Sequence, residues 1–181
     1  MPRTFLLLMF CLAVPALAKA QQPVTNPNNG RDTSYKSIPA VARGTIGPVT
    51  VTVEYASPRV RNRIIWGGVV PFDQVWVSGA HMATRITFSA PCRMGKQRIE
   101  AGTYAFYTLP GPKEWTVILN KNYRQHLADN YDQKLDVLRL AVTPRSSKNH
   151  RERLQYFIED SKLILAWERL EIEVPLTAEK K

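Results

Sequence analysis

The residues best able to bind a ligand are concentrated between positions 54 and 84. Two of the four tryptophans, three closely spaced arginines and a histidine fall in this segment. Guanidinium groups bind carboxylates and phosphates through paired hydrogen bonds, and aromatic faces stack on sugar rings and other flat ligands. Loops on a rigid scaffold are where such residues form sites. The candidate ligand-binding residues are Arg59, Arg61, Arg63, Trp66, Trp76, His81 and, from a later segment, Tyr107.

The same residues also have a purely structural interpretation. Trp66 and Trp76 would then fill the ends of a β-sandwich, and the three arginines would form a solvated surface. The two interpretations predict different surroundings. A binding site requires that Trp66, Trp76 and His81 converge on one open pocket, whereas a structural role buries both tryptophans under strands.

The sequence contains no recognisable catalytic signature. The motifs G-x-S-x-G and H-E-x-x-H are missing, and no cysteine has a papain-like setting. The carboxylates are scattered, and none is paired with a base at a readable spacing. Catalytic residues therefore stay unassigned. If the protein is an enzyme, its best candidate residues are His81, Arg63, Glu54 and Tyr107.

The histidines do not form a metal-binding motif. His81, His126 and His150 are the three in the chain, and no pair has the spacing HxH or HxxxH. A zinc site would need ligands that are far apart in the sequence. We therefore predict no metal and no cofactor.

The N-terminus has the order of a secretory signal peptide. Arg3 precedes an unbroken apolar run over 5–14, Pro15 ends the run, and small residues lead to a cleavage site after Ala20. The run is shorter than the roughly 20 apolar residues that a spanning helix needs. We expect a soluble exported protein, periplasmic or extracellular after cleavage, with no membrane span.

The charge and the cysteine content limit the partners. The net charge of +10 falls to +8 when the signal peptide removes Arg3 and Lys19, and Cys92 becomes the sole cysteine, which excludes an intramolecular disulfide. We expect Cys92 to be a half-buried residue at a strand end. Outside the cytoplasm a basic protein meets no nucleic acid, so the expected partners are an acidic glycan, a lipid headgroup or a small molecule of the cell envelope. The oligomeric state stays open.

Alternation of apolar and polar residues predicts that the chain is built from β-strands. The predicted strands are 49–55, 84–88, 104–109, 115–119, 138–142, 154–158 and 163–174. Turn-rich segments separate them, which is typical of an all-β protein with an antiparallel β-sandwich or a partly closed barrel. We expect one short helix at most, over 123–131, where Tyr123, Leu127 and Tyr131 share a face. Glu168 interrupts an apolar face, which predicts a bulge or a break in the strand near this residue.

The chain divides into one folded domain and its flanking segments. We predict a signal peptide over 1–20, a flexible leader over 21–36 that is rich in turn residues, a single β-sandwich domain over 37–177 and a charged tail over 178–181.

Seven runs of the sequence resemble one bacterial family. They are VEYASP (53–58), RIIWGGVVPF (63–72), VWVSGA (75–80), ATRITF (83–88), AGTY (101–104), EWTVILNK (114–121) and DVLR (136–139). The family is catalogued as domain of unknown function 2911, and the resemblance implies an exported β-sandwich without an assigned activity. His81 and Met82 stand where the family pattern commonly has Asn and Glu, so no role of that carboxylate is carried over.

Three hypotheses for the function follow. The first is a ligand-binding or envelope-interaction module, whose recognition surface is the segment of tryptophans and arginines. The second is an enzyme of unrecognised type that acts on envelope carbohydrate or peptide. The third is a structural assembly subunit with no small ligand.

Overall fold

The computed structural model describes residues 25, 27–28 and 34–179, which form an almost entirely β-structure. The predicted signal peptide and most of the predicted leader lie outside the described residues. The elements are β1 (Ile38–Ile46), β2 (Val49–Ser57), β3 (Arg85–Phe88), β4 (Cys92–Met94), β5 (Gln97–Ile99), β6 (Gly102–Leu109), β7 (Trp115–Asn120), a 3-10 turn η1 (Gln133–Leu135), β8 (Asp136–Val142), β9 (Arg145–Glu159) and β10 (Lys162–Ala178). Over the described part of the chain, no helix is long and apolar enough to cross a membrane.

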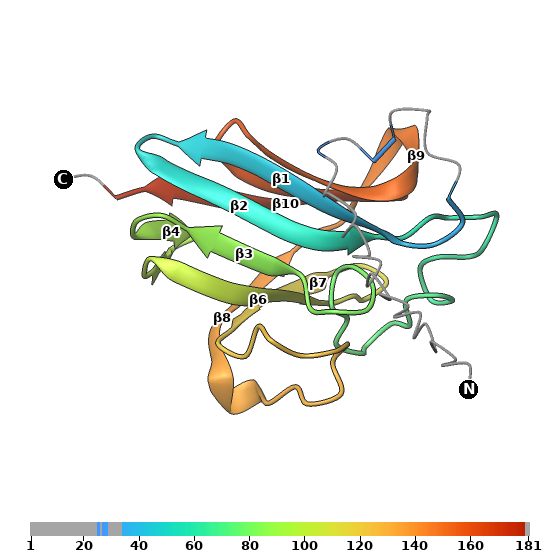
Figure 1. Cartoon of the computed structure of the whole chain (residues 1–181), viewed down its shortest axis with the longest axis horizontal. Helices are drawn as coiled ribbons and strands as arrows, with labels where there is room; N and C mark the ends of the chain where they lie inside the picture. The colour runs from blue at the N-terminus through green and yellow to red at the C-terminus, as the bar shows by residue number, and fades with distance from the viewer. Residues whose placement is uncertain (1–24, 26, 29–33, 180–181) are drawn as a thin grey trace, which may run out of the picture.

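Two antiparallel sheets make up the fold, as Figure 1 shows. The larger sheet has the order β1-β2-β3-β6-β7-β8, and the smaller has the order β5-β4-β10-β9. The sheets stay open rather than closing into a barrel. The predicted all-β antiparallel sandwich is therefore confirmed, and the barrel alternative is not.

The core lies between the sheets and is built by the alternation seen in the sequence. On β2, Val49, Val51, Val53 and Tyr55 are buried while the residues between them are not. The main cluster of buried side chains draws on both sheets. Each large apolar side chain that leaves water contributes about 1.5–3 kcal/mol to stability, which is why this pattern selects one face of the strand.

A tight hairpin and a bulge shape the smaller sheet. Asp160 and Ser161 join β9 to β10 with φ values of 48° and 58°, as in a two-residue primed turn. The predicted bulge at Glu168 is confirmed, because the pairing register of β10 with β9 shifts on both sides of this residue. Beyond it, β10 returns towards its own start, where Lys162 Nζ lies 2.8 Å from Glu173 Oε2. This hydrogen bond lowers the pKa of Glu173 below its usual value.

The predicted helix over 123–131 is wrong, because this segment consists of turns and irregular structure. One hydrogen bond, from Tyr131 N to Ala128 O (3.0 Å), closes a turn within it, and other backbone groups pair with the loop around His81. Ala83 N donates to Gln125 O (3.0 Å), and Leu127 N donates to His81 O (2.6 Å). Leu127 also has a φ of 46°, which a right-handed helix cannot accommodate. Tertiary hydrogen bonds have overridden a weak local helical pattern.

Three strands were not predicted. In β1, Gly44 obscured the pattern, and the structure shows its reason: a Cβ at Gly44 would lie 2.6 Å from the carbonyl oxygen of Ile158. Strands β4 and β5 have three residues each, too short for a period to show. Cys92 does begin a strand, but it is fully buried rather than half-buried. Its burial, and to a lesser extent the negative charge of the nearby Glu179, raises the pKa of its thiol to about 11.

Candidate functional site

Six of the seven candidate residues lie in one long connection, 58–84, between β2 and β3. Its start is attached to the smaller sheet, because Val60 N donates to Glu152 O of β9 (2.7 Å). Its later part is attached to the larger sheet, because Trp76 and Thr108 of β6 exchange two main-chain hydrogen bonds of 2.8 and 3.0 Å. The connection is thus held against both sheets at the end of the sandwich that lies opposite β4 in Figure 1.

A groove of about 810 Å³ opens beside this connection, and we call it the basic groove. Its polar side is formed by Lys36, Arg59, Arg61, Arg63 and His81. Its apolar side is formed by Val69, Val70, Trp76, Leu127 and Trp167. No aspartate or glutamate is among the described residues that line it. The groove therefore combines four cations with an aromatic and aliphatic wall.

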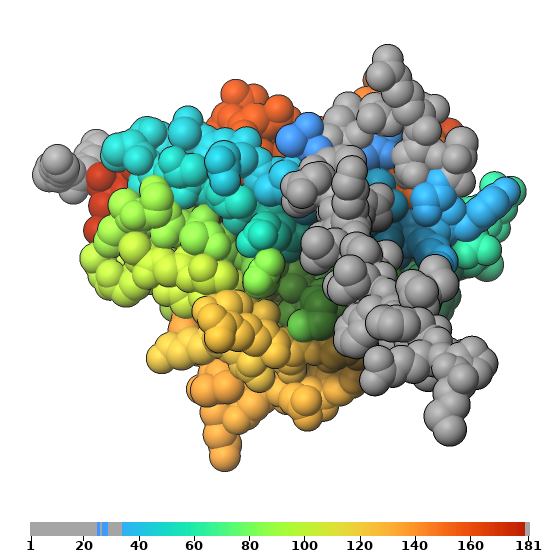
Figure 2. All heavy atoms as spheres, in the orientation of Figure 1, coloured from blue at the N-terminus to red at the C-terminus, as the bar shows by residue number. Residues whose placement is uncertain are grey.

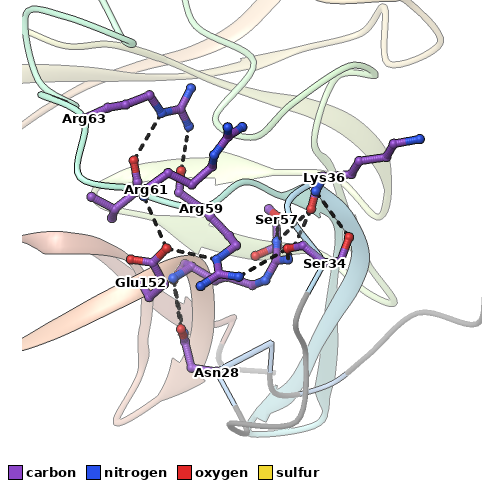
Figure 3. Close-up of polar contacts among 10 residues, drawn as sticks. Asn28, Ser34, Lys36, Ser57, Arg59, Arg61, Arg63 and Glu152 are labelled. Atoms are coloured by element: carbon purple, nitrogen blue, oxygen red, sulfur yellow. Dashed lines mark hydrogen bonds and ion pairs between the residues drawn. The ribbon is translucent and has the colours of Figure 1, made fainter.

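The three arginines of the connection are held differently, as Figure 3 shows. Arg59 is neutralised by an ion pair with Glu152, at 2.9 Å from Nε to Oε1. The Arg63 guanidinium donates to the carbonyl oxygens of Val60 (3.1 Å) and Arg59 (2.6 Å), which orients it without cancelling its charge. The Arg61 guanidinium lies over the Tyr35 ring at 5.6 Å and has no ion pair within the described residues. Arg61 and Arg63 thus remain available to an anion.

A buried arginine that the sequence analysis did not single out supports one wall of the groove. Arg153 of β9 is 2% exposed, and its guanidinium donates to the carbonyl oxygens of Ser57 (2.7 Å), Ser34 (2.7 Å) and Lys36 (3.1 and 3.2 Å). Asn28 adds two hydrogen bonds to the Arg153 backbone. These contacts seat residues 34–36 beside the groove (Figure 3). No local signal distinguishes Arg153 from its basic neighbours, so only the tertiary structure reveals this role.

The two candidate tryptophans have different surroundings. Trp76 lines the basic groove and stacks on Trp167, with ring centroids 5.9 Å apart and an angle of 18°. Trp66 instead packs edge-on between Trp115 (4.8 Å) and Trp167 (5.8 Å), and lines a separate hollow beside Ile64. Trp66 therefore packs between one tryptophan of each sheet. Trp76 packs on Trp167 and also lines the groove.

Trp167 also lines the groove, but it is 1% exposed. Its indole N–H has no acceptor within the described residues, and the same holds for the indole N–H groups of Trp66 and Trp115. The three unpartnered donors therefore belong to the tryptophan cluster that packs beneath the groove.

The remaining candidates do not complete a catalytic group. Tyr107 is buried outside the groove, where it contacts Gln125 and burial raises its pKa to about 12. Glu54 pairs with Arg85 at 3.2 Å and lines another hollow. Of the enzyme candidates, the groove therefore gathers only His81 and Arg63. Among the described residues, no cluster of three or more His, Cys, Asp or Glu side chains could hold a metal ion.

The backbone around the groove is unusually strained. Non-glycine residues with positive φ are sparse in proteins, and strain of this kind is often stored at functional sites. Six such residues line the groove or directly adjoin a lining residue: Arg61 (53°), Asn62 (54°), Ser78 (53°), His81 (64°), Leu127 (46°) and Glu168 (57°). The core holds Ser78 in place, because Tyr156 Oη donates to its carbonyl oxygen at 2.6 Å. Burial raises the pKa of Tyr156 well above its usual value, so this donor keeps its proton.

Comparison with known proteins gives one match. A family model described as "Protein of unknown function (DUF2911)" matches residues 37–176. Neither the curated proteins nor the solved structures include a significant match to the chain. Tyr35 and Lys36, which line the groove, precede the matched region.

Proposed function

Because the chain belongs to the DUF2911 family, whose description states no function, we propose a function from the basic groove itself. The protein is an exported ligand-binding module, and the groove takes an anionic ligand that also has an apolar or flat portion. The observation that carries the proposal is the lining of the groove: four cations and no carboxylate among the described residues, together with Trp76 and Trp167. Its volume of about 810 Å³ suits a small molecule.

The charges of the groove support an anionic ligand. Glu152 compensates Arg59, but the side chains of Lys36, Arg61 and Arg63 have no ion pair within the described residues. Like charges that are held together destabilise a protein unless they are solvated or meet an anion. An arginine fork binds a phosphate or carboxylate in a two-point contact, and Arg63 is already oriented by two carbonyl oxygens.

The opposite wall supports an amphiphilic ligand. Val69 and Leu127 are aliphatic and exposed and offer nothing to the hydroxyl groups of a glycan, but they can cover an alkyl chain. Trp76 adds a flat face. Among the partners expected for an envelope protein, these features favour an anionic amphiphile over an acidic glycan.

The proposal is tested by titration with hexyl phosphate, which has one phosphate and one short apolar chain. Because Trp76 and Trp167 line the groove, binding should change the tryptophan fluorescence. We expect hexyl phosphate to bind more tightly than inorganic phosphate or hexanol, each of which engages only one wall. The single variants Arg61→Gln and Arg63→Gln should each bind hexyl phosphate about tenfold more weakly or worse, because each loses a charge-assisted hydrogen bond to the phosphate.

Arg93→Gln is the matched control, because it removes the same charge from β4, at the end of the sandwich opposite the connection. It should leave the affinity within about twofold. Equal affinity for hexyl phosphate in Arg61→Gln, Arg63→Gln and Arg93→Gln would contradict the proposal, as would a complete lack of binding by the unaltered protein.

A further inference from the structure

The rim of the basic groove exposes an unusual amount of apolar surface. The described residues include six exposed large apolar side chains, and four of them surround the groove: Tyr35 (73% exposed), Ile64 (78%), Val69 (41%) and Leu127 (40%). Single exposed apolar residues are ordinary, but a group of them around a site marks an interaction surface. We call these four residues the apolar rim, and the cations that neighbour it are Lys36, Arg61 and Arg63.

The fold presents Ile64 to solvent in a defined way. Ile65, the next residue, is 2% exposed, so the chain buries one isoleucine and exposes the other. Main-chain hydrogen bonds close the loop beyond it: Val69 N donates to Ile64 O (3.0 Å), and Val70 N donates to Ile65 O (2.9 Å). A Cβ at Gly68 would lie 2.4 Å from the Ile64 carbonyl oxygen, so this compact loop requires a glycine there. Main-chain hydrogen bonds of this loop therefore hold Ile64 in its exposed position.

Cations flank these apolar side chains. Arg61 and Arg63 precede Ile64 in the sequence, and Lys36 follows Tyr35, whose ring lies 5.6 Å from the Arg61 guanidinium carbon. In Figure 2 the segment near Tyr35 and the start of the β2–β3 connection lie side by side at one edge of the molecule. No carboxylate is paired with Lys36, Arg61 or Arg63 within the described residues. Apolar tips next to uncompensated cations are the composition of a surface that binds an anionic bilayer.

We propose that the apolar rim docks this protein on the surface of an anionic lipid bilayer. Ile64 enters the boundary between headgroups and acyl chains, Tyr35 lies at the level of the headgroups, and Lys36, Arg61 and Arg63 contact lipid phosphates. The inference goes beyond the groove ligand, because it rests on exposed side chains of the rim. It also places the mouth of the groove at the membrane, where anionic amphiphiles are found.

Co-sedimentation with lipid vesicles tests the docking. The full mature chain is mixed with vesicles of phosphatidylcholine alone or with about one third phosphatidylglycerol. We expect binding to the anionic vesicles, little binding to the neutral ones, and a loss of binding between about 50 and 500 mM salt, because salt screens exposed charges. Replacing Arg61 with glutamine should weaken binding about fivefold.

The decisive variant is Ile64→Asp, which adds a charge to a side chain that is 78% exposed. It should weaken vesicle binding at least tenfold. Leu135→Asp is the matched control, because Leu135 is also an exposed apolar residue (37%) but belongs to the 3-10 turn before β8. It should bind as the unaltered protein does. Ile64→Phe, which keeps the apolar tip, should retain binding.

The docking proposal and the proposal of a groove ligand can be refuted separately. Ile64 does not line the groove, so the neutral variant Ile64→Ser should lose vesicle binding and still bind hexyl phosphate within about twofold of the unaltered protein, whereas the new carboxylate of Ile64→Asp, beside Arg63, should also repel the phosphate. Hexyl phosphate binding without vesicle binding overturns the docking and leaves the groove proposal standing. Vesicle binding that Ile64→Asp and Leu135→Asp reduce equally, or not at all, also overturns it. Vesicle binding sensitive to Ile64 with no hexyl phosphate binding supports the docking and overturns the groove proposal.

Discussion

Arg61 and Arg153 carry the same charge in opposite surroundings. Arg153 is buried, and its donors are used by main-chain carbonyl oxygens of three residues. The Arg61 guanidinium lies over the ring of Tyr35 and has no ion pair within the described residues. The first is therefore suited to holding the structure, and the second to meeting a ligand from outside the protein.

The structural role of Arg153 leads to a prediction about stability. Arg153→Met keeps the length of the side chain but leaves the buried carbonyl oxygen of Ser57 without this donor. A buried polar group that loses its partner costs about 1–3 kcal/mol, so the free energy of unfolding should fall by about 2–3 kcal/mol in a urea titration. Arg43→Met, at an exposed position of β1, should change it by less than about 0.5 kcal/mol. A stable Arg153→Met variant would refute the role assigned to Arg153.

At the scale of elements, β10 is the strand that shapes the molecule. Its first half pairs with β9, and its last residues pair with β4. Within the part that pairs with β9, Glu168 has a φ of 57° and the register shifts on both sides of it. The change of direction brings Leu176 N within 2.8 Å of the carbonyl oxygen of Ser161 in the β9–β10 turn. The bulge thus lets one long strand pair with β9 along its first part and with β4 at its end.

The backbone at Glu168 predicts how substitutions there will behave. Glycine tolerates a positive φ, whereas a β-branched residue does not. Glu168→Gly should change the free energy of unfolding by less than about 1 kcal/mol, while Glu168→Val should lower it by about 1–2 kcal/mol. Arg169→Val, at the next and exposed position of β10, is the control and should be close to neutral. If valine is tolerated equally at both positions, the bulge does not depend on this residue.

At the scale of the whole molecule, the open question is where the protein works. The signal peptide remains a prediction, because residues 1–20 lie outside the described residues. Expressed in a secreting bacterium, the protein should leave the cytoplasm with the mass of a chain that begins at Gln21 and carries a net charge of +8. Leu7→Arg, which interrupts the apolar run, should keep the full-length chain in the cytoplasm. A full-length mass outside the cytoplasm would contradict cleavage, and an unchanged location of Leu7→Arg would contradict the signal.

The same tertiary features explain why the molecule has two different ends. The β2–β3 connection and the segment around Tyr35 meet at one end, where the cations, the strained backbone and the exposed apolar side chains gather. Short strands and a tight turn between Met94 and Gln97 form the other end. The proposed binding groove therefore lies at the end where a long connection is held against both sheets.

The amino-acid sequence by itself determined the strands whose side chains alternate, such as the run from Val49 to Tyr55, because alternation is a local property of an extended chain. It also singled out Arg61, Arg63, Trp76 and His81, which the structure brings to one groove. Only the tertiary structure decided that Trp66 packs between the sheets, that Tyr107 is buried, that the segment over 123–131 is not helical, and that Arg153 seats the segment around Lys36. Each of these outcomes depends on contacts between residues far apart in the chain, and no local pattern encodes such contacts.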